Sequence, residues 1–116
     1  MQGGLVVLEK TVEIAILFDF YGTLLTDRQR QIMALRYEDD LSLAEIAEQF
    51  AVSRQAVHDA ITRTTQQLHE YERKLGLAKA RRDRRDLAAT LVKALREQGC
   101  YDDRIGTLIG ELTDGE

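Results

Sequence analysis

Residues 41–63 read LSLAEIAEQFAVSRQAVHDAITR, and this stretch decides the fold of the chain. Ser42 is a favourable helix N-cap, and Glu45 lies three residues later, where its carboxylate can accept a hydrogen bond from the amide of the cap. This capping box predicts the start of a short helix. Apolar residues then recur at helical spacing, which predicts one buried face formed by Leu43, Ile46, Ala47 and Phe50.

A second helix is predicted after the turn at residues 51–53, with Ser53 as its N-cap. Two short amphipathic helices joined by such a turn form a helix-turn-helix, whose second helix enters a groove of nucleic acid. A plain helical hairpin inside a bundle would show the same pattern, so the residues alone leave both interpretations open. The apolar side of the second helix carries Val57, Ile61, Thr64 and Leu68.

The other side of the second helix carries the candidate nucleic-acid-binding residues. Helices of this kind contact base edges from their N-terminal end. Asp59 lies on nearly the same face, and the turn at residues 38–40 (Glu-Asp-Asp) is close in sequence, so both oppose tight contact with phosphate. The candidates are Ser53, Arg54, Gln55 and His58, with Thr62 and Arg63 further along the helix.

The composition favours helices throughout. The chain has 116 residues and no proline, and it is rich in Leu, Ala, Glu, Arg and Gln, which are good helix formers. We therefore predict an all-α fold, a helical bundle with a central helix-turn-helix and a long C-terminal helical extension. The expected division is a flexible leader at residues 1–10, the helix-turn-helix domain at 11–76, and the extension at 77–116 packed on that domain.

One further helix is predicted just before the helix-turn-helix. Thr26 is its N-cap, and Gln29 completes a second capping box three residues later. The helix ends at the acidic turn of residues 38–40. Its apolar residues are Ile32, Met33, Leu35 and Tyr37.

Three features are typical of a cytoplasmic protein. Glu13 and Asp19 interrupt the longest apolar stretches, which fall short of the roughly 20 residues that a membrane span needs. Residues 1–4 lack the basic segment of a secretion signal. Cys100 is the single cysteine and cannot form an internal disulfide. We therefore expect no membrane insertion.

Charge is segregated along the chain. The net charge is −4, yet residues 51–96 carry eleven Lys and Arg against five Asp and Glu, whereas residues 1–50 carry four against nine and residues 97–116 one against six. A basic middle is expected where phosphates bind, although a solvated basic helix would give the same count. The most basic run is KARRDRR at residues 79–85. Its candidate phosphate contacts are Arg81, Arg82, Arg84 and Arg85, and on a solvated face Arg82 would instead pair with Asp86.

Residues 11–20 are ambiguous, because their alternation fits a strand while their composition also fits a buried helix. ILFDFYGTLL, residues 16–25, resembles the first motif of haloacid-dehalogenase-type hydrolases, with Asp19 in the position of the nucleophile. That chemistry needs a parallel sheet and further carboxylates for magnesium, whereas the chain downstream predicts only helices. His58 and His69 have no Cys or paired carboxylate at metal-ligand spacing. We therefore expect no enzymatic activity, no metal site and no cofactor.

The C-terminal tail, residues 101–116, has two interpretations. It is either a short helix capped by Asp102 or Asp103, or a disordered acidic segment. As a helix it would pack on the bundle or on a second subunit, so a homodimer is one possible assembly.

Two family resemblances extend over these motifs. Residues 25–64 are similar to region four of bacterial sigma factors, the domain that reads the upstream promoter element. The runs FDFYGTLLTDRQ (18–29), DDLSLAEIAEQFAVSRQAVHD (39–59) and YERKLGL (71–77) together resemble the YlxM family, small helical cytoplasmic proteins associated with the bacterial signal recognition particle. This second resemblance spans about residues 9–77 and implies that the segment FDFY ends a first helix.

The YlxM resemblance implies a regulatory role beside the signal recognition particle, without catalytic residues. The protein would bind the RNA of the particle or one of its protein components, such as its GTPase. The sigma-factor resemblance implies the alternative, a transcriptional regulator that binds duplex DNA. A third interpretation is an interaction module whose helix-turn-helix packs only against protein.

Overall fold

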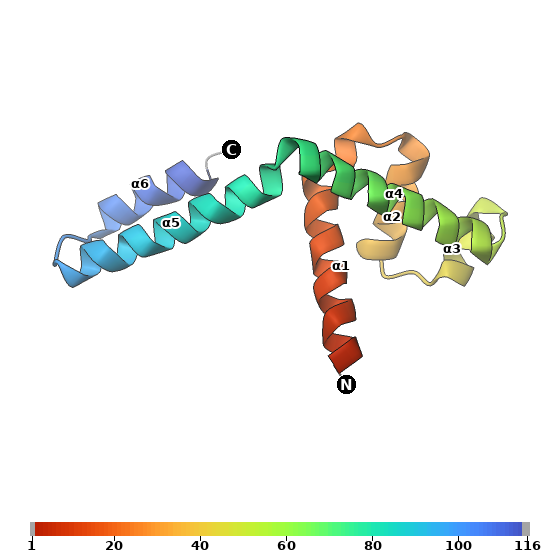
Figure 1. Ribbon diagram of the computed structural model, residues 1–116, viewed down its shortest axis with the longest axis horizontal. Coiled ribbons are helices and arrows are strands. Elements are labelled where there is room, and N and C mark those ends of the chain that lie inside the picture. Colours follow the sequence, from red (N-terminus) through yellow and green to blue (C-terminus); the bar gives the residue numbers. More distant parts are fainter. Residues whose placement is uncertain (1, 115–116) are drawn as a thin grey trace. The chain divides into compact units, whose positions relative to one another are not determined.

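The structure is a computed structural model that describes the backbone of residues 2–114 and the side chains of residues 10–113. Within this range it has six α-helices, one short 3₁₀ helix and no strand (Figure 1). The predicted all-α fold is therefore confirmed. The elements are α1 (Gln2–Tyr21), η1 (Gly22–Leu24), α2 (Asp27–Tyr37), α3 (Leu43–Phe50), α4 (Arg54–Leu75), α5 (Leu77–Glu97) and α6 (Asp103–Asp114).

The chain divides into two compact units, Met1–Gly76 and Leu77–Glu116. The first unit holds α1 to α4 and the second holds α5 and α6. The boundary lies at Gly76, whose φ of 62° is left-handed and whose amide donates a 2.8 Å hydrogen bond to the Glu72 carbonyl. A glycine suits this position because a side chain would strain the left-handed backbone. Packing of the second unit on the first stays a prediction.

Helix α1 resolves the ambiguity of residues 11–20, which are helical, as the YlxM resemblance implies. The helix starts at Gln2, so most of the predicted leader has helical backbone; no proline interrupts it. Its flexibility stays a prediction. Asp19 is exposed on α1 and does not follow a strand, which removes the structural context that a hydrolase nucleophile would need.

Helix α4 is the centre of the first unit and packs against α1, α2 and α3 (Figure 1). At its N-terminal half, Val57 joins a buried cluster with residues of α2 and α3. At its C-terminal half, Leu68 is fully buried, and the Tyr21 hydroxyl donates a 2.5 Å hydrogen bond to the Glu72 carboxylate. The two ends of α4 are thus held by different contacts. The cluster contains Ile32, Ile46, Ala47 and Val57.

Side-chain caps fix the starts of α2, α3 and α4. Thr26 and Ser42 each form the complete capping box that the sequence predicts, with Gln29 and Glu45 respectively. The Ser53 hydroxyl oxygen accepts a 3.0 Å hydrogen bond from the amide of the third residue of α4. These caps place the turn between α3 and α4, so the predicted helix-turn-helix is present.

The second unit is a helical hairpin. Asp102 caps α6, since its carboxylate accepts a 2.8 Å hydrogen bond from the Ile105 amide, and the tail is helical to Asp114. The Arg96 guanidinium lies 4.5 Å from the centre of the Tyr101 ring. A Cβ at Gly106 would overlap the Tyr101 hydroxyl, so the glycine allows this close approach. No helix in the described part of the chain is long and apolar enough to cross a membrane.

Candidate nucleic-acid interface

The first six candidate residues lie on one accessible side of α4 and its cap. Ser53 is exposed, although its hydroxyl oxygen is occupied by the cap hydrogen bond. The opposite side of α4 is buried through Val57, Thr64 and Leu68, as the apolar periodicity predicts. Burial of that side leaves the other side open to a ligand. The exposed side chains are Arg54, Gln55, His58, Thr62 and Arg63.

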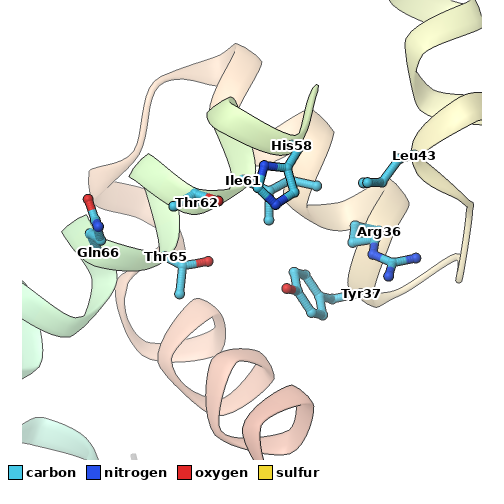
Figure 2. A pocket seen from close by; sticks show the side chains of 8 residues that line it. All are labelled: Arg36, Tyr37, Leu43, His58, Ile61, Thr62, Thr65 and Gln66. Carbon is cyan, nitrogen blue, oxygen red and sulfur yellow. The ribbon is translucent and has the colours of Figure 1, made fainter. Parts of the chain in front are cut away.

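A groove runs along this accessible side of α4. It consists of two cavities of about 350 Å³ and 640 Å³, which share Leu43 and His58 in their walls. We call it the α4 groove. The first cavity is lined by Arg36 and Tyr37 of α2, Leu43 of α3, and His58, Ile61, Thr62, Thr65 and Gln66 of α4 (Figure 2). The second is lined by Ser42, Leu43, Ala44, Arg54, Gln55 and His58.

The walls of the α4 groove favour an anionic ligand. Two arginines, Arg36 and Arg54, line it together with His58, and no Asp or Glu is among the described residues that line either cavity. The acidic turn at residues 38–40 and Asp59 therefore lie outside the groove walls. The sequence places these carboxylates near the candidate residues, but the groove itself is free of them.

Asp59 instead contacts two of the candidate residues. The Gln55 side-chain nitrogen donates a 2.9 Å hydrogen bond to its Oδ1, and His58 Nδ1 lies 3.6 Å from the same atom. The Asp59 side chain is 47% exposed. Its negative charge is thus solvated and lies beside the groove.

Tyr37 and Arg36 form the α2 side of the groove. Burial raises the pKa of the Tyr37 hydroxyl above its ordinary value, while the Arg36 charge and a hydrogen bond with the Thr65 side chain act in the opposite direction. Tyr37 is therefore neutral at physiological pH. Arg36 donates a 3.0 Å hydrogen bond from Nη1 to the Leu41 carbonyl, which anchors its guanidinium at the edge of the groove.

The remaining candidates belong to the second unit and lie on α5, but they do not share one face of that helix. Arg82 and Arg85 are exposed, whereas Arg81 and Arg84 are partly buried. Arg84 lines a mainly apolar cavity of about 280 Å³ between α5 and α6. An ion pair of this run joins Lys79 Nζ to Asp83 Oδ2 at 2.8 Å, one turn along the helix.

Among the residues that sequence reasoning missed are four with polar side chains in the first cavity: Arg36, Tyr37, Thr65 and Gln66. Tyr37 falls in the apolar stripe of α2, so periodicity assigns it to the core. Arg36 and Tyr37 reach the groove only because α2 packs against α4, and spacing within one helix does not reveal this contact. A signal did exist for Thr65 and Gln66, which follow Thr62 by three and four residues and so share its face.

No group of three His, Cys, Asp or Glu side chains that could hold a metal ion occurs among the described residues. The two histidines instead lie beside single carboxylates. His69 Nδ1 is 3.7 Å from Glu13 Oε1, and His58 is close to Asp59.

A capped second helix, a turn with a left-handed residue at Ala51 and an open recognition face define a helix-turn-helix protein. Comparison with known proteins gives the family. The family model described as "Putative helix-turn-helix protein, YlxM / p13 like" matches residues 8–106, and the chain belongs to this family. The predicted resemblance to YlxM is thereby confirmed.

Relatives from Geobacillus and Bacillus agree with the family match. A UPF0122 protein of Geobacillus kaustophilus is 47% identical over 107 residues, covering 92% of this chain and 97% of the relative. A UPF0122 protein of Bacillus mycoides is 55% identical over 91 residues, covering 78% of this chain and 83% of the relative. A UPF0122 protein of Bacillus anthracis is 54% identical over the same length and with the same coverage.

Proposed function

We propose that the protein is a non-enzymatic helix-turn-helix accessory protein of the signal recognition particle pathway, and that it binds the RNA of the particle. The observation that carries this proposal is the α4 groove, which is lined by two arginines and a histidine, with no carboxylate among the described residues of its walls. Positive charge without an opposing carboxylate attracts a phosphate backbone. The exposed arginines of α5 supply a second basic surface for the same ligand.

The choice of this pathway rests on the resemblance to the YlxM family. Family membership is compatible with a role beside the particle, and the basic middle of the chain is compatible with an RNA ligand. The GTPase of the particle is the protein partner that the same resemblance suggests.

A DNA-binding transcriptional regulator is the second candidate. The helix-turn-helix favours it, because the exposed N-terminal half of α4 is the part that reads the major groove in DNA-binding proteins of this class. The two candidates share the α4 surface and differ in the ligand.

A titration with three ligands tests the proposal. The full chain is titrated with labelled signal recognition particle RNA, random RNA of the same length and a pool of genomic duplexes, each at two salt concentrations. We expect the particle RNA to bind most tightly and every affinity to fall steeply with salt, because bound cations release counterions from the phosphates. Preference for the duplexes would support the regulator instead.

Two variants locate the binding surface. Arg54→Ala removes a groove arginine, and Arg73→Ala is the matched control, since Arg73 is exposed at the other end of α4 and pairs with Glu70. Replacing the four arginines of residues 81–85 with Gln tests the α5 surface. If none of these changes weakens binding, the proposal that these surfaces bind nucleic acid is wrong. Capture of the GTPase without RNA affinity would favour the protein-interaction module.

A further inference from the structure

The smaller cavity of the α4 groove has the volume of a small-molecule site. Its volume is about 350 Å³, which lies in the range of pockets that enclose compact ligands. In Figure 2 the His58 imidazole and the Tyr37 ring border the hollow from opposite sides. Ile61 and Leu43 supply apolar wall between them. A ligand in this hollow would therefore lie close to both rings.

The polar groups around this cavity match the edges of a nucleobase. Thr62, Thr65 and Gln66 line one side and together offer hydroxyl and amide groups that both donate and accept hydrogen bonds. Arg36 lines the cavity from the side of α2, with its guanidinium bonded to the Leu41 carbonyl, and it adds positive charge there. Aromatic faces with amide and hydroxyl groups at the rim are the means by which proteins bind unstacked bases.

The adjoining, larger cavity can hold the sugar and phosphate of the same nucleotide. Arg54 and Gln55 line it, and His58 belongs to both cavities. A base in the smaller cavity would place its sugar and phosphate near the His58 boundary, where Arg54 can neutralise the phosphate charge. The absence of carboxylates from the described walls favours this arrangement.

We infer that the cavity between Tyr37 and His58 binds one unpaired base of an RNA ligand, in contact with the two rings. This inference deepens the proposed function and rests on it. In a duplex, neighbouring base pairs cover both faces of each base, so only a base that has left the stack can enter. Single-stranded loops and bulges of RNA present such bases, and RNA-binding proteins recognise them in this way.

The test compares two RNA duplexes that differ only by one added adenosine: one is fully paired, and the other carries that adenosine as a single bulge. Binding of the full chain is measured by fluorescence anisotropy. We expect the bulged RNA to bind about 10-fold more tightly, because one base stacked on aromatic side chains contributes an effect of this order. Equal affinity for the two duplexes would overturn the inference. A bulged DNA duplex that binds as tightly as the bulged RNA would contradict the assignment to RNA.

Two variants of Tyr37 separate stacking from folding. Tyr37→Leu should abolish the preference for the bulge, and Tyr37→Phe should keep it because the ring is retained. A 2-aminopurine in the bulge gives an independent signal in the unmodified protein, since its fluorescence is quenched when it stacks on a ring. Unchanged fluorescence on binding, or a preference that survives in Tyr37→Leu, would show that the base does not enter this cavity.

The outcome also distinguishes this inference from the proposed function. If Arg54→Ala weakens binding of signal recognition particle RNA and of both duplexes while the bulge makes no difference, RNA binding by the groove holds and the base-binding site is wrong. If neither the particle RNA nor either duplex binds, both are wrong.

Discussion

The Gln55 side-chain amide donates a 2.9 Å hydrogen bond to the Asp59 carboxylate on the exposed side of α4. The same carboxylate oxygen lies 3.6 Å from His58 Nδ1. Asp59 therefore orients the Gln55 side chain and lies beside His58, while its negative charge repels phosphate. We therefore expect Asp59 to lower the affinity of α4 for a phosphate-bearing ligand while it orients Gln55.

Asp59→Asn should strengthen binding of RNA. The asparagine oxygen can still accept the hydrogen bond from Gln55, and only the negative charge is lost. A unit charge about 4 Å from a phosphate in water is worth about 1 kcal/mol, so we expect roughly a 5-fold gain in affinity at low salt, declining as salt screens it. Asp19→Asn, a matched change at an exposed position of α1, should have little effect. Equal affinities of Asp59→Asn and the unmodified protein would show that α4 does not approach phosphate at this position.

Ala51→Gly should raise the melting temperature. Ala51 ends α3 with φ 54° and ψ 44°, a left-handed conformation that costs a residue with a Cβ about 1 kcal/mol relative to glycine. Glycine also gains freedom in the unfolded chain, which reduces the benefit. Thermal unfolding followed by circular dichroism measures the difference, and a clear fall in melting temperature would contradict the role of strain at this turn.

Tyr21→Phe should destabilise the first unit by about 1–2 kcal/mol. The Tyr21 ring is fully buried, and its hydroxyl donates a hydrogen bond to the Glu72 carboxylate, whose side chain is only partly exposed. Hydrogen bonds to charged groups contribute about 1.5–3 kcal/mol, and partial exposure of Glu72 reduces the loss. Urea unfolding gives the free energy, with Tyr101→Phe in the second unit as a matched loss of a hydroxyl. An unchanged free energy in Tyr21→Phe would mean that this bond adds nothing to the packing of α1 on α4.

Lowering the pH should destabilise the N-terminal turn of α3. Hydrogen bonds with the Ser42 backbone and side chain lower the pKa of Glu45 below its ordinary value of 4.5. Because the pKa is lower in the folded state, the stabilising contribution of Glu45 is complete above about pH 4.5. It is lost as the pH falls through the pKa that Glu45 has in the folded protein. Glu45→Gln keeps a capping side chain that does not titrate. Its melting temperature should therefore change less than that of the unmodified protein between pH 6 and pH 3, and identical pH profiles would exclude this contribution.

Local signals in the sequence were enough to predict much of the fold. Ser42 and Thr26 with their partners three residues later define helix starts, and the structure shows both boxes. Such features depend on neighbouring residues only, which is why spacing predicts them.

The interface could be predicted only in part, because it combines residues from different helices. Arg54, Gln55, His58 and Thr62 share a face of one helix, so periodicity identifies them. Tyr37 has the same periodicity as the core residues of α2, and only the packing of α2 on α4 turns it toward the groove. Residues 11–20 are helical and belong to α1, which packs against α4; alternation along ten residues does not reveal such a contact.

The most direct test of nucleic-acid binding through the α4 groove is the salt dependence of affinity for signal recognition particle RNA. The dissociation constant is measured at several salt concentrations for the unmodified protein, Arg54→Ala and Arg73→Ala. If Arg54 neutralises one phosphate, the slope of log affinity against log salt should be smaller by about 0.7–0.9 in Arg54→Ala, and unchanged in Arg73→Ala. Identical slopes for all three proteins would contradict the account, because the groove would then hold no phosphate.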